Sequence, residues 1–193
     1  MPQGCGRALV IPRELRVAGA ELQVLPIPEA AALRTSPAPL RSAGSGAAAA
    51  PLAAGSQVEI RLVCTWAQPA APPSTGVTGV RTLASADGAY YTELGYDWAQ
   101  KAFYADHSHC CAAFLPNVIV QRAPLPLPML GAALNLTLFV DGGLIEAFLG
   151  GRVITPLVAP DVAAGGAPEE RVSRVVNTAP GVSCSAESWQ LAY

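Results

Sequence analysis

Charged residues are scarce in this sequence. Asp, Glu, Lys and Arg make up 13% of its 193 residues, about half the usual share near 25%. The net charge of −2 excludes the basic stripe of a nucleic-acid-binding protein and the cationic surface that attracts anionic lipids. No run of 18 apolar residues is present, so no membrane-spanning helix is expected. We therefore expect neither nucleic acid nor membrane as a partner.

Signals for export and for metal binding are also missing. The opening stretch MPQGCGRALVIPRE has only a short apolar run, broken by Pro12 and by charge, unlike a signal peptide. No C-x-x-C pair occurs, so a zinc ribbon is not expected. An odd number of cysteines leaves at least one thiol unpaired within the chain and the redox compartment open. The cysteines are Cys5, Cys64, Cys110, Cys111 and Cys184.

Short β-type segments make up most of the ordered pattern. The clearest is 57–66, where Val58, Ile60 and Leu62 alternate with polar residues, as in a strand with one buried side. One helix is predicted, over 28–34. Further strands are predicted at 77–85, 89–97, 101–106, 152–158 and 182–192, and Pro/Ala/Gly-rich loops at 35–56, 67–76, 122–132 and 159–170. The pattern predicts an all-β fold with long loops, either a sandwich or a barrel.

The stretch LTLFVDGGLIEAFLGG (136–151) predicts a hairpin around Gly142-Gly143, because both glycines can adopt positive φ. Asp141 then lies opposite Leu144, and Phe139 opposite Glu146. One face is wholly apolar and is predicted to be the core side: Leu136, Leu138, Val140, Ile145, Ala147 and Leu149. The other face mixes two acids with large apolar side chains.

Asp141 and Glu146 are the candidate acid/base pair of this hairpin. Diagonal neighbours on a sheet lie roughly 7–8 Å apart, a separation compatible with inverting glycoside hydrolysis. A flat sheet face, however, lacks the concave pocket that catalytic carboxylates need. We therefore favour a contact surface with another domain, with these candidate residues: Phe139, Asp141, Leu144, Glu146 and Phe148.

The same stretch resembles the C-terminal β-sandwich of glycoside hydrolase family 32, the invertases, fructanases and related fructosyltransferases. It is similar to the family pattern Val-Asp-x-Ser-x-Val-Glu-x-Phe, followed by Gly-Arg-x-x-x-Thr. The resemblance covers roughly residues 8–193. Its other pieces, in order, are Pro12-Arg13-Glu14-Leu15, Gln23 to Pro28, Leu33-Arg34, Val58-Glu59-Ile60, Tyr91-Thr92, Gly95-Tyr96-Asp97, Asp106-x-Ser108 and Trp189-Gln190-Leu191.

The resemblance implies an all-β fold, a two-sheet antiparallel β-sandwich of concanavalin-like or jelly-roll-like type with long Pro/Ala/Gly-rich loops. It also implies a non-catalytic module. Family 32 enzymes carry their catalytic carboxylates on a preceding five-bladed propeller, in the motifs Asn-Asp-Pro, Arg-Asp-Pro and Glu-Cys, and none of the three occurs here. We expect residues 1–7 to be a remnant of the linker from that propeller and 8–193 to be the sandwich. The implied role is to stabilise the propeller, in cis or in trans, in sucrose or fructan metabolism. No catalytic residue, cofactor or metal is expected, and the chain alone is predicted to be inactive.

Two alternatives stay open: a free-standing carbohydrate-binding module, in which Trp66, Trp98, Trp189 or Tyr90-Tyr91 stack on sugar, and an inactive truncated fragment. His107 and His109 suggest a metal site only weakly, because zinc ligand pairs are usually more widely spaced. Asn135-Leu136-Thr137 is an N-glycosylation sequon, so Asn135 is a glycosylation candidate if the chain is secreted. The resemblance implies an extracellular or vacuolar location.

Overall fold

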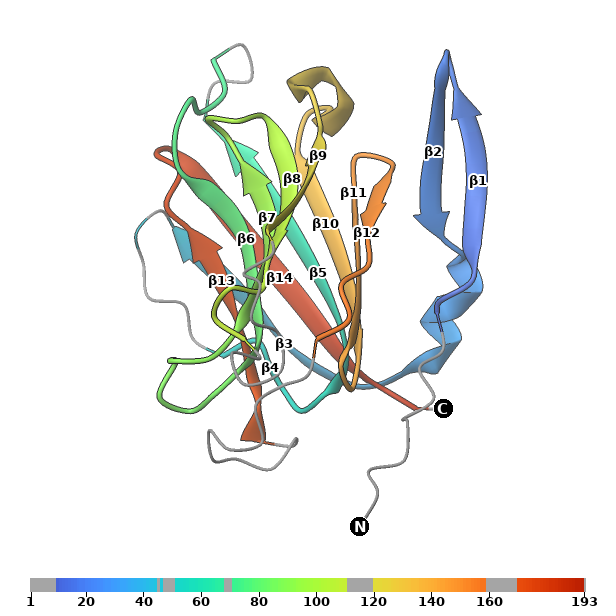
Figure 1. Ribbon diagram of the computed structural model, residues 1–193, viewed down its shortest axis with the longest axis vertical. Coiled ribbons are helices and arrows are strands. Elements are labelled where there is room, and N and C mark those ends of the chain that lie inside the picture. The colour runs from blue at the N-terminus through green and yellow to red at the C-terminus, as the bar shows by residue number, and fades with distance from the viewer. Residues whose placement is uncertain are drawn as a thin grey trace.

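The computed structural model describes residues 10–44, 46, 51–67, 71–110, 120–158 and 170–192. Two six-stranded antiparallel sheets pack face to face (Figure 1). The first has the order β12-β11-β10-β5-β14-β3 and the second β4-β13-β6-β7-β8-β9. The predicted all-β sandwich is confirmed. In the described part of the chain, no helix is long and apolar enough to cross a membrane.

The first sheet, which carries the candidate site, is built from six segments: β3 (Arg34–Gly44), β5 (Gln57–Trp66), β10 (Leu134–Asp141), β11 (Leu144–Leu149), β12 (Arg152–Ile154) and β14 (Val182–Leu191). The second sheet contains β4 (Ala53–Ala54), β6 (Val77–Ala84), β7 (Thr92–Asp97), β8 (Ala102–Asp106), β9 (Val120–Pro124) and β13 (Val172–Asn177). A further hairpin, β1 (Arg13–Ala18) and β2 (Glu21–Pro26), stands beside β12 as its own two-stranded sheet (Figure 1).

The predicted hairpin register is confirmed. Asp141 pairs with Leu144, Val140 with Ile145 and Phe139 with Glu146, and Gly142 has φ +59°. All six residues predicted to face inward are buried in the main core between the sheets. Residue alternation therefore sufficed to orient this strand pair.

Three sequence predictions were wrong or incomplete. The 35–56 segment, predicted to be loop, contains β3 and β4. Proline is tolerated in β3 because this strand lies at the edge of its sheet, where one row of N–H groups needs no partner. The 122–132 segment holds most of β9, also an edge strand, and the 3-10 helix η2 (Leu127–Leu130). The predicted helix at 28–34 is a 3-10 helix, η1 (Pro28–Leu33), and the β1–β2 hairpin was not predicted.

Candidate interdomain anchor

The outer face of the first sheet is partly covered by the chain's own N-terminal arm, which we define as residues 10–34. Phe139 and Phe148, 4% exposed each, meet edge to face with ring centroids 6.1 Å apart. Around them lies a second small apolar cluster, separate from the main core. Its other members are Ile11, Ala30 and Leu191, with Val24, Ile27, Leu33 and Val153 at its margin. The arm thus supplies most of the apolar cover for this face.

Glu146 fixes the beginning of the arm. Its side chain is 2% exposed, and its Oε2 accepts a hydrogen bond of 2.5 Å from the Ile11 backbone N–H. Its Oε1 accepts from Arg13 Nε at 3.2 Å and from Arg13 Nη2 at 2.5 Å. Arg13 also donates to Thr155 Oγ1 at 3.0 Å. The buried carboxylate is therefore both ion-paired and hydrogen-bonded, as a buried charge must be.

Glu59 fixes the end of the arm in the same way. It is 0% exposed, and Arg34 donates to both of its oxygens at 2.7 Å, the fork geometry that guanidinium and carboxylate favour. Arg61 adds a third bond at 3.0 Å. The hydrogen bond to Glu59 raises the pKa of Arg34. Arg34 also lies over the Trp189 ring, 4.2 Å from its centroid.

The two carboxylates belong to one row across the sheet. Phe139 pairs with Glu146 on one side and with Glu59 on the other, and Glu59 pairs with Trp189. With neighbouring strands about 4.7–4.9 Å apart, the two carboxylates are held roughly 9–10 Å apart by Phe139. Each receives an arginine from one end of the arm. The arrangement fixes the position of the arm on the sandwich.

The hairpin of the arm extends beyond these contacts. Its β2 strand rests against the β11–β12 turn, where Val24 N–H donates to Gly151 O at 2.9 Å and Arg152 Nη1 donates to Leu22 O at 3.0 Å. The β1–β2 register places Leu15, Val17 and Leu22 on one face. Their exposed fractions are 64%, 78% and 53%. Val24 lies on the same face, opposite Leu15, and packs against the apolar cluster. Only the outer part of this apolar face is therefore uncovered.

The five predicted contact residues occupy different positions. Phe139, Glu146 and Phe148 come together in the anchor, beneath the arm. Leu144 is buried and forms an isolated bridge with Leu157, and Asp141 is partly exposed and accepts from Gln57 Nε2 at 3.2 Å. That these residues contact a preceding domain stays a prediction; in this structure the arm covers the first three. The sequence did suggest that Glu59 points away from the core, but not that Arg34 meets it.

Other sequence candidates lie elsewhere. Asp141 and Glu146 have separate structural partners, Gln57 and Arg13. His107 is buried, whereas the His109 ring stacks on Tyr91 with centroids 4.5 Å apart. Within the described ranges, no group of three or more His, Cys, Asp or Glu side chains is placed to hold a metal. Asn135 is exposed on β10, on the same face as Phe139 but outside the anchor.

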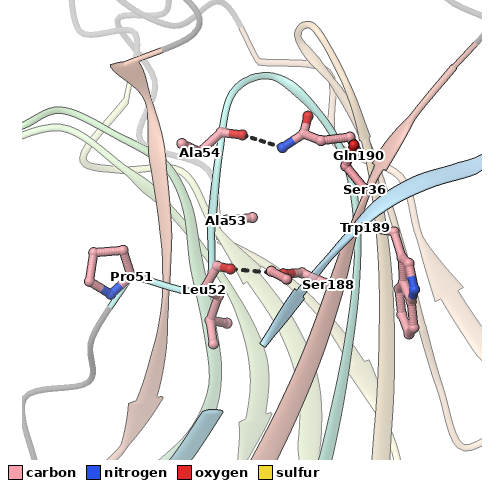
Figure 2. Close-up of a pocket in the computed structure, with 9 residues that line it drawn as sticks. Ser36, Pro51, Leu52, Ala53, Ala54, Ser188, Trp189 and Gln190 are labelled. Carbon is pink, nitrogen blue, oxygen red and sulfur yellow. Dashed lines mark hydrogen bonds between the residues drawn. The ribbon is translucent and has the colours of Figure 1, made fainter. Parts of the chain in front are cut away.

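A shallow pocket of about 210 Å³ lies where β4 meets β3 and β14 (Figure 2). Ser188 Oγ donates to Leu52 O at 2.8 Å, and Gln190 Nε2 donates to Ala54 O at 2.7 Å. Figure 2 shows the Trp189 ring on the far side of β14 from Ala53. The pocket therefore offers no stacking surface for a sugar, and its polar side chains already join the two sheets.

Comparison with known proteins agrees with the fold. The family profile "Glycosyl hydrolases family 32 C terminal" matches residues 29–188. No curated protein sequence matches the chain. Among solved structures, exo-inulinase from Aspergillus awamori is similar, with a TM-score of 0.72 and 21% identity over 95% of this chain and 35% of that one. Fructan 1-exohydrolase IIa from Cichorium intybus has a TM-score of 0.67 and 15% identity over 94% of this chain and 40% of that one.

Sucrose-6-phosphate hydrolase from Lactobacillus gasseri is similar in the same way, with a TM-score of 0.64 and 17% identity over 93% of this chain and 33% of that one. The chain thus spans only 33–40% of the length of these three enzymes. The TM-scores of 0.64–0.72 show a shared fold, and the family profile covers most of the chain. By this match, the chain belongs to glycosyl hydrolase family 32, as a member of its C-terminal domain family.

Proposed function

We propose that this chain is the non-catalytic β-sandwich module of a β-fructofuranosidase-like protein, and that it stabilises a catalytic propeller in sucrose or fructan metabolism. Three similar structures, named as an inulinase, a fructan exohydrolase and a sucrose-6-phosphate hydrolase, support this substrate class. This chain spans only 33–40% of the length of these structures. The remaining length leaves room for a propeller domain. As part of the proposal, residues 1–7 are a linker remnant; they lie outside the described residues.

The observation that carries the proposal is the anchored arm. Glu146 and Glu59 hold its two ends, while the hairpin between them presents Leu15, Val17 and Leu22 uncovered. Apolar side chains at the centre with charged neighbours such as Glu14 and Arg16 are the usual anatomy of a protein interface. The occupant we propose is the propeller, which would bury this face. A position fixed at both ends would transmit the rigidity of the sandwich to that domain.

The alternative of a carbohydrate-binding module, as the sequence suggested it, needs aromatic rings that are free to stack on sugar. Arg34 lies over the Trp189 ring, and Arg81 and His109 both lie against Tyr91. Trp66 and Trp98 pack edge to face, with centroids 5.2 Å apart. The rings of Trp66, Trp98, Trp189 and Tyr91 are therefore engaged with protein groups. We expect no retention of the purified chain on immobilised inulin.

Fructose release tests the absence of catalysis. The purified chain, incubated with sucrose and with inulin, is expected to release no fructose above an enzyme-free blank. Turnover would overturn the proposal, because the retaining mechanism needs two carboxylates about 5–5.5 Å apart and the anchor commits Glu146 and Glu59 to arginines.

In parallel, the transcript upstream of this chain is expected to encode Asn-Asp-Pro, Arg-Asp-Pro and Glu-Cys in frame. An in-frame stop there would favour the truncated fragment.

A further inference from the structure

A second area of the first sheet's outer face is not covered by the arm. It is a shallow groove of about 330 Å³ over β5, β14 and β3. Its floor is hydroxyl-rich, with Ser42, Thr65, Ser183 and Ser185 around Val63. Val63 is 40% exposed, one of few large apolar side chains left open on the described surface. Hydroxyl groups that donate and accept, set around a small apolar patch, suit a sugar chain, which has both kinds of surface.

The groove lines up with Asn135, the asparagine of the only N-x-Ser/Thr sequon in the sequence. Asn135 pairs with Val63, Val63 with Ser185, and Ser185 with Ser42, so the four form one row on the outer face. Strand spacing of about 4.7–4.9 Å places Ser42 roughly 14–15 Å from Asn135 along this row. A glycan attached at Asn135 can therefore lie along the groove without crossing the arm.

The geometry of Asn135 is compatible with modification. The residue is exposed, and its Nδ2 donates to Ala133 O at 3.1 Å. An amide NH₂ has two hydrogens, and a glycosylated asparagine keeps one of them. The bond to Ala133 can therefore persist after modification and hold the amide in place, with the sugar attached at the other position.

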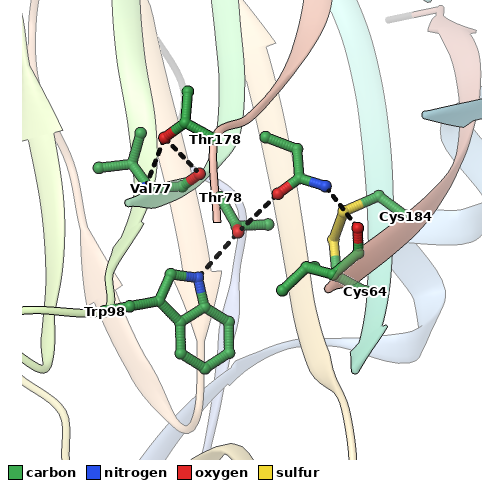
Figure 3. Close-up of a disulfide and its surroundings, with 8 residues drawn as sticks. Cys64, Val77, Thr78, Trp98, Thr178 and Cys184 are labelled. Atoms are coloured by element: carbon green, nitrogen blue, oxygen red, sulfur yellow. Dashed lines mark hydrogen bonds between the residues drawn. A yellow bond between two sulfur atoms is a disulfide. The ribbon is translucent and has the colours of Figure 1, made fainter. Parts of the chain in front are cut away.

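The disulfide between Cys64 and Cys184 supplies an independent indication of the compartment. These residues face each other on β5 and β14, with Cα atoms 4.1 Å apart (Figure 3). Cys184 also lies beside the groove. Disulfides form and persist in oxidising compartments such as the ER lumen and the cell exterior. That is where asparagine sequons are glycosylated.

We propose that Asn135 is N-glycosylated and that the first sugars of the glycan lie in the Val63–Ser185–Ser42 groove. In the reaction, Nδ2 forms a bond to the anomeric carbon of an oligosaccharide carried on a lipid pyrophosphate. The bond between that carbon and the pyrophosphate oxygen breaks, the lipid pyrophosphate leaves, and one amide proton is released. The glycan covers the part of the sheet that the arm leaves open. This inference does not depend on the proposed function.

The first test is occupancy. The chain is expressed in a eukaryotic secretory host and its intact mass is measured before and after peptide-N-glycosidase treatment. We expect a glycan mass that the enzyme removes and that Asn135→Gln and Thr137→Ala both abolish. A secreted, folded chain without that mass overturns the proposal.

The second test asks whether the glycan lies in the groove. The glycosylated chain is expected to melt about 2–4 °C above the Asn135→Asp variant, which carries the residue that enzymatic deglycosylation leaves; this shift corresponds to roughly 1 kcal/mol for a chain of this size. Val63→Ser is expected to remove most of the glycan-dependent shift. The control Val17→Ser, an exposed valine on the hairpin, is expected to leave it intact. An equal shift in wild type and Val63→Ser, or no shift at all, shows a glycan that does not use the groove.

Discussion

At the scale of single residues, the anchor depends on two carboxylates that water hardly reaches. Glu59 and Glu146 are 0% and 2% exposed, and each is bound by an arginine at one end of the arm. Desolvation makes such pairs weak contributors to net stability, but the loss of one partner is costly because a charge then stays buried and uncompensated. Their role is therefore to specify where the arm lies, and substitutions should reveal an asymmetry between single and double changes.

We predict that Arg34→Met lowers the free energy of unfolding by about 1.5–3 kcal/mol, because Glu59 loses its bidentate partner and keeps only the bond from Arg61. The double variant Arg34→Met/Glu59→Met is expected to recover most of the loss. Urea unfolding at pH 7 measures both. Arg16→Met, which removes an exposed ion pair with Glu14, is the control and is expected to leave the midpoint unchanged. Equal losses in the single and double variants would refute the role of Glu59.

A second residue-scale prediction concerns alkaline pH. Burial raises the pKa of Tyr96 to about 12, and its hydroxyl donates to Leu125 O at 2.9 Å. Below pH 10 both folded and unfolded states keep the proton, so the contribution is constant. Between pH 10 and 12 only the unfolded state loses it, so the free energy of unfolding falls. We expect Tyr96→Phe to show a smaller fall over this range in urea titrations at stepped pH. Parallel curves for the two proteins would contradict the assignment.

At the scale of elements, two glycines allow two neighbouring strands of the second sheet to lie close together. Gly79 on β6 and Gly95 on β7 face each other, and a Cβ on Gly79 would lie 2.2 Å from Leu94 O. Backbone occupies that space on both strands, so no side-chain rotation can relieve the clash. The pair lets β6 and β7 approach more closely than residues with side chains would permit.

We therefore predict that Gly79→Ala destabilises the chain by more than about 4 kcal/mol or prevents folding, a loss typical of severe overpacking. Gly44→Ala is the matched control, since a Cβ there meets nothing within 4 Å and the φ is not positive. Circular dichroism and thermal melting of the two variants provide the comparison. Comparable melting temperatures would show that the close approach is not required.

The same scale shows how far the sequence could lead. The alternation of apolar and polar residues in 57–66 and 136–149 predicted which side chains point into the core, and it predicted the β10–β11 register. It succeeded because these strands lie within the sheet and only one of their faces packs against the core. It failed for β3, because a proline-rich segment is typical of a linker. Prolines fit this strand only because it lies at the edge of the sheet. It also failed for the anchor, because Arg34 meets Glu59 only when β3 and β5 lie on either side of β14 in the sheet. Contacts between distant segments leave no local periodicity.

At the scale of the whole molecule, the disulfide joins two strands that are adjacent in the sheet but 120 residues apart in the chain. Nearby, Trp98 Nε1 donates to Thr78 Oγ1 at 2.8 Å (Figure 3). Asn177 Nδ2 donates to Val182 O at 2.9 Å. The crosslink closes a long loop in the unfolded chain, where the entropy saved is largest.

We predict that Cys64→Ala/Cys184→Ala lowers the free energy of unfolding by about 2–5 kcal/mol. Wild type in the presence of a strong reductant is expected to lose at least as much stability as the variant, because the reductant also reduces the disulfide of Cys110. Urea unfolding with and without reductant measures the effect. A variant as stable as the oxidised wild type would show that the crosslink contributes nothing.

The central claim is that the anchored hairpin is the docking element for a preceding domain, and side-chain footprinting tests it most directly. Hydroxyl-radical labelling, read by mass spectrometry, is applied to this 193-residue chain and to the proposed longer polypeptide, in which a catalytic propeller precedes it. We predict strong labelling of Leu15, Val17 and Leu22 in the short chain and at least severalfold protection in the long one, with Leu40 and Leu157 labelled equally in both as controls. Equal labelling of the hairpin in the two polypeptides would contradict the claim.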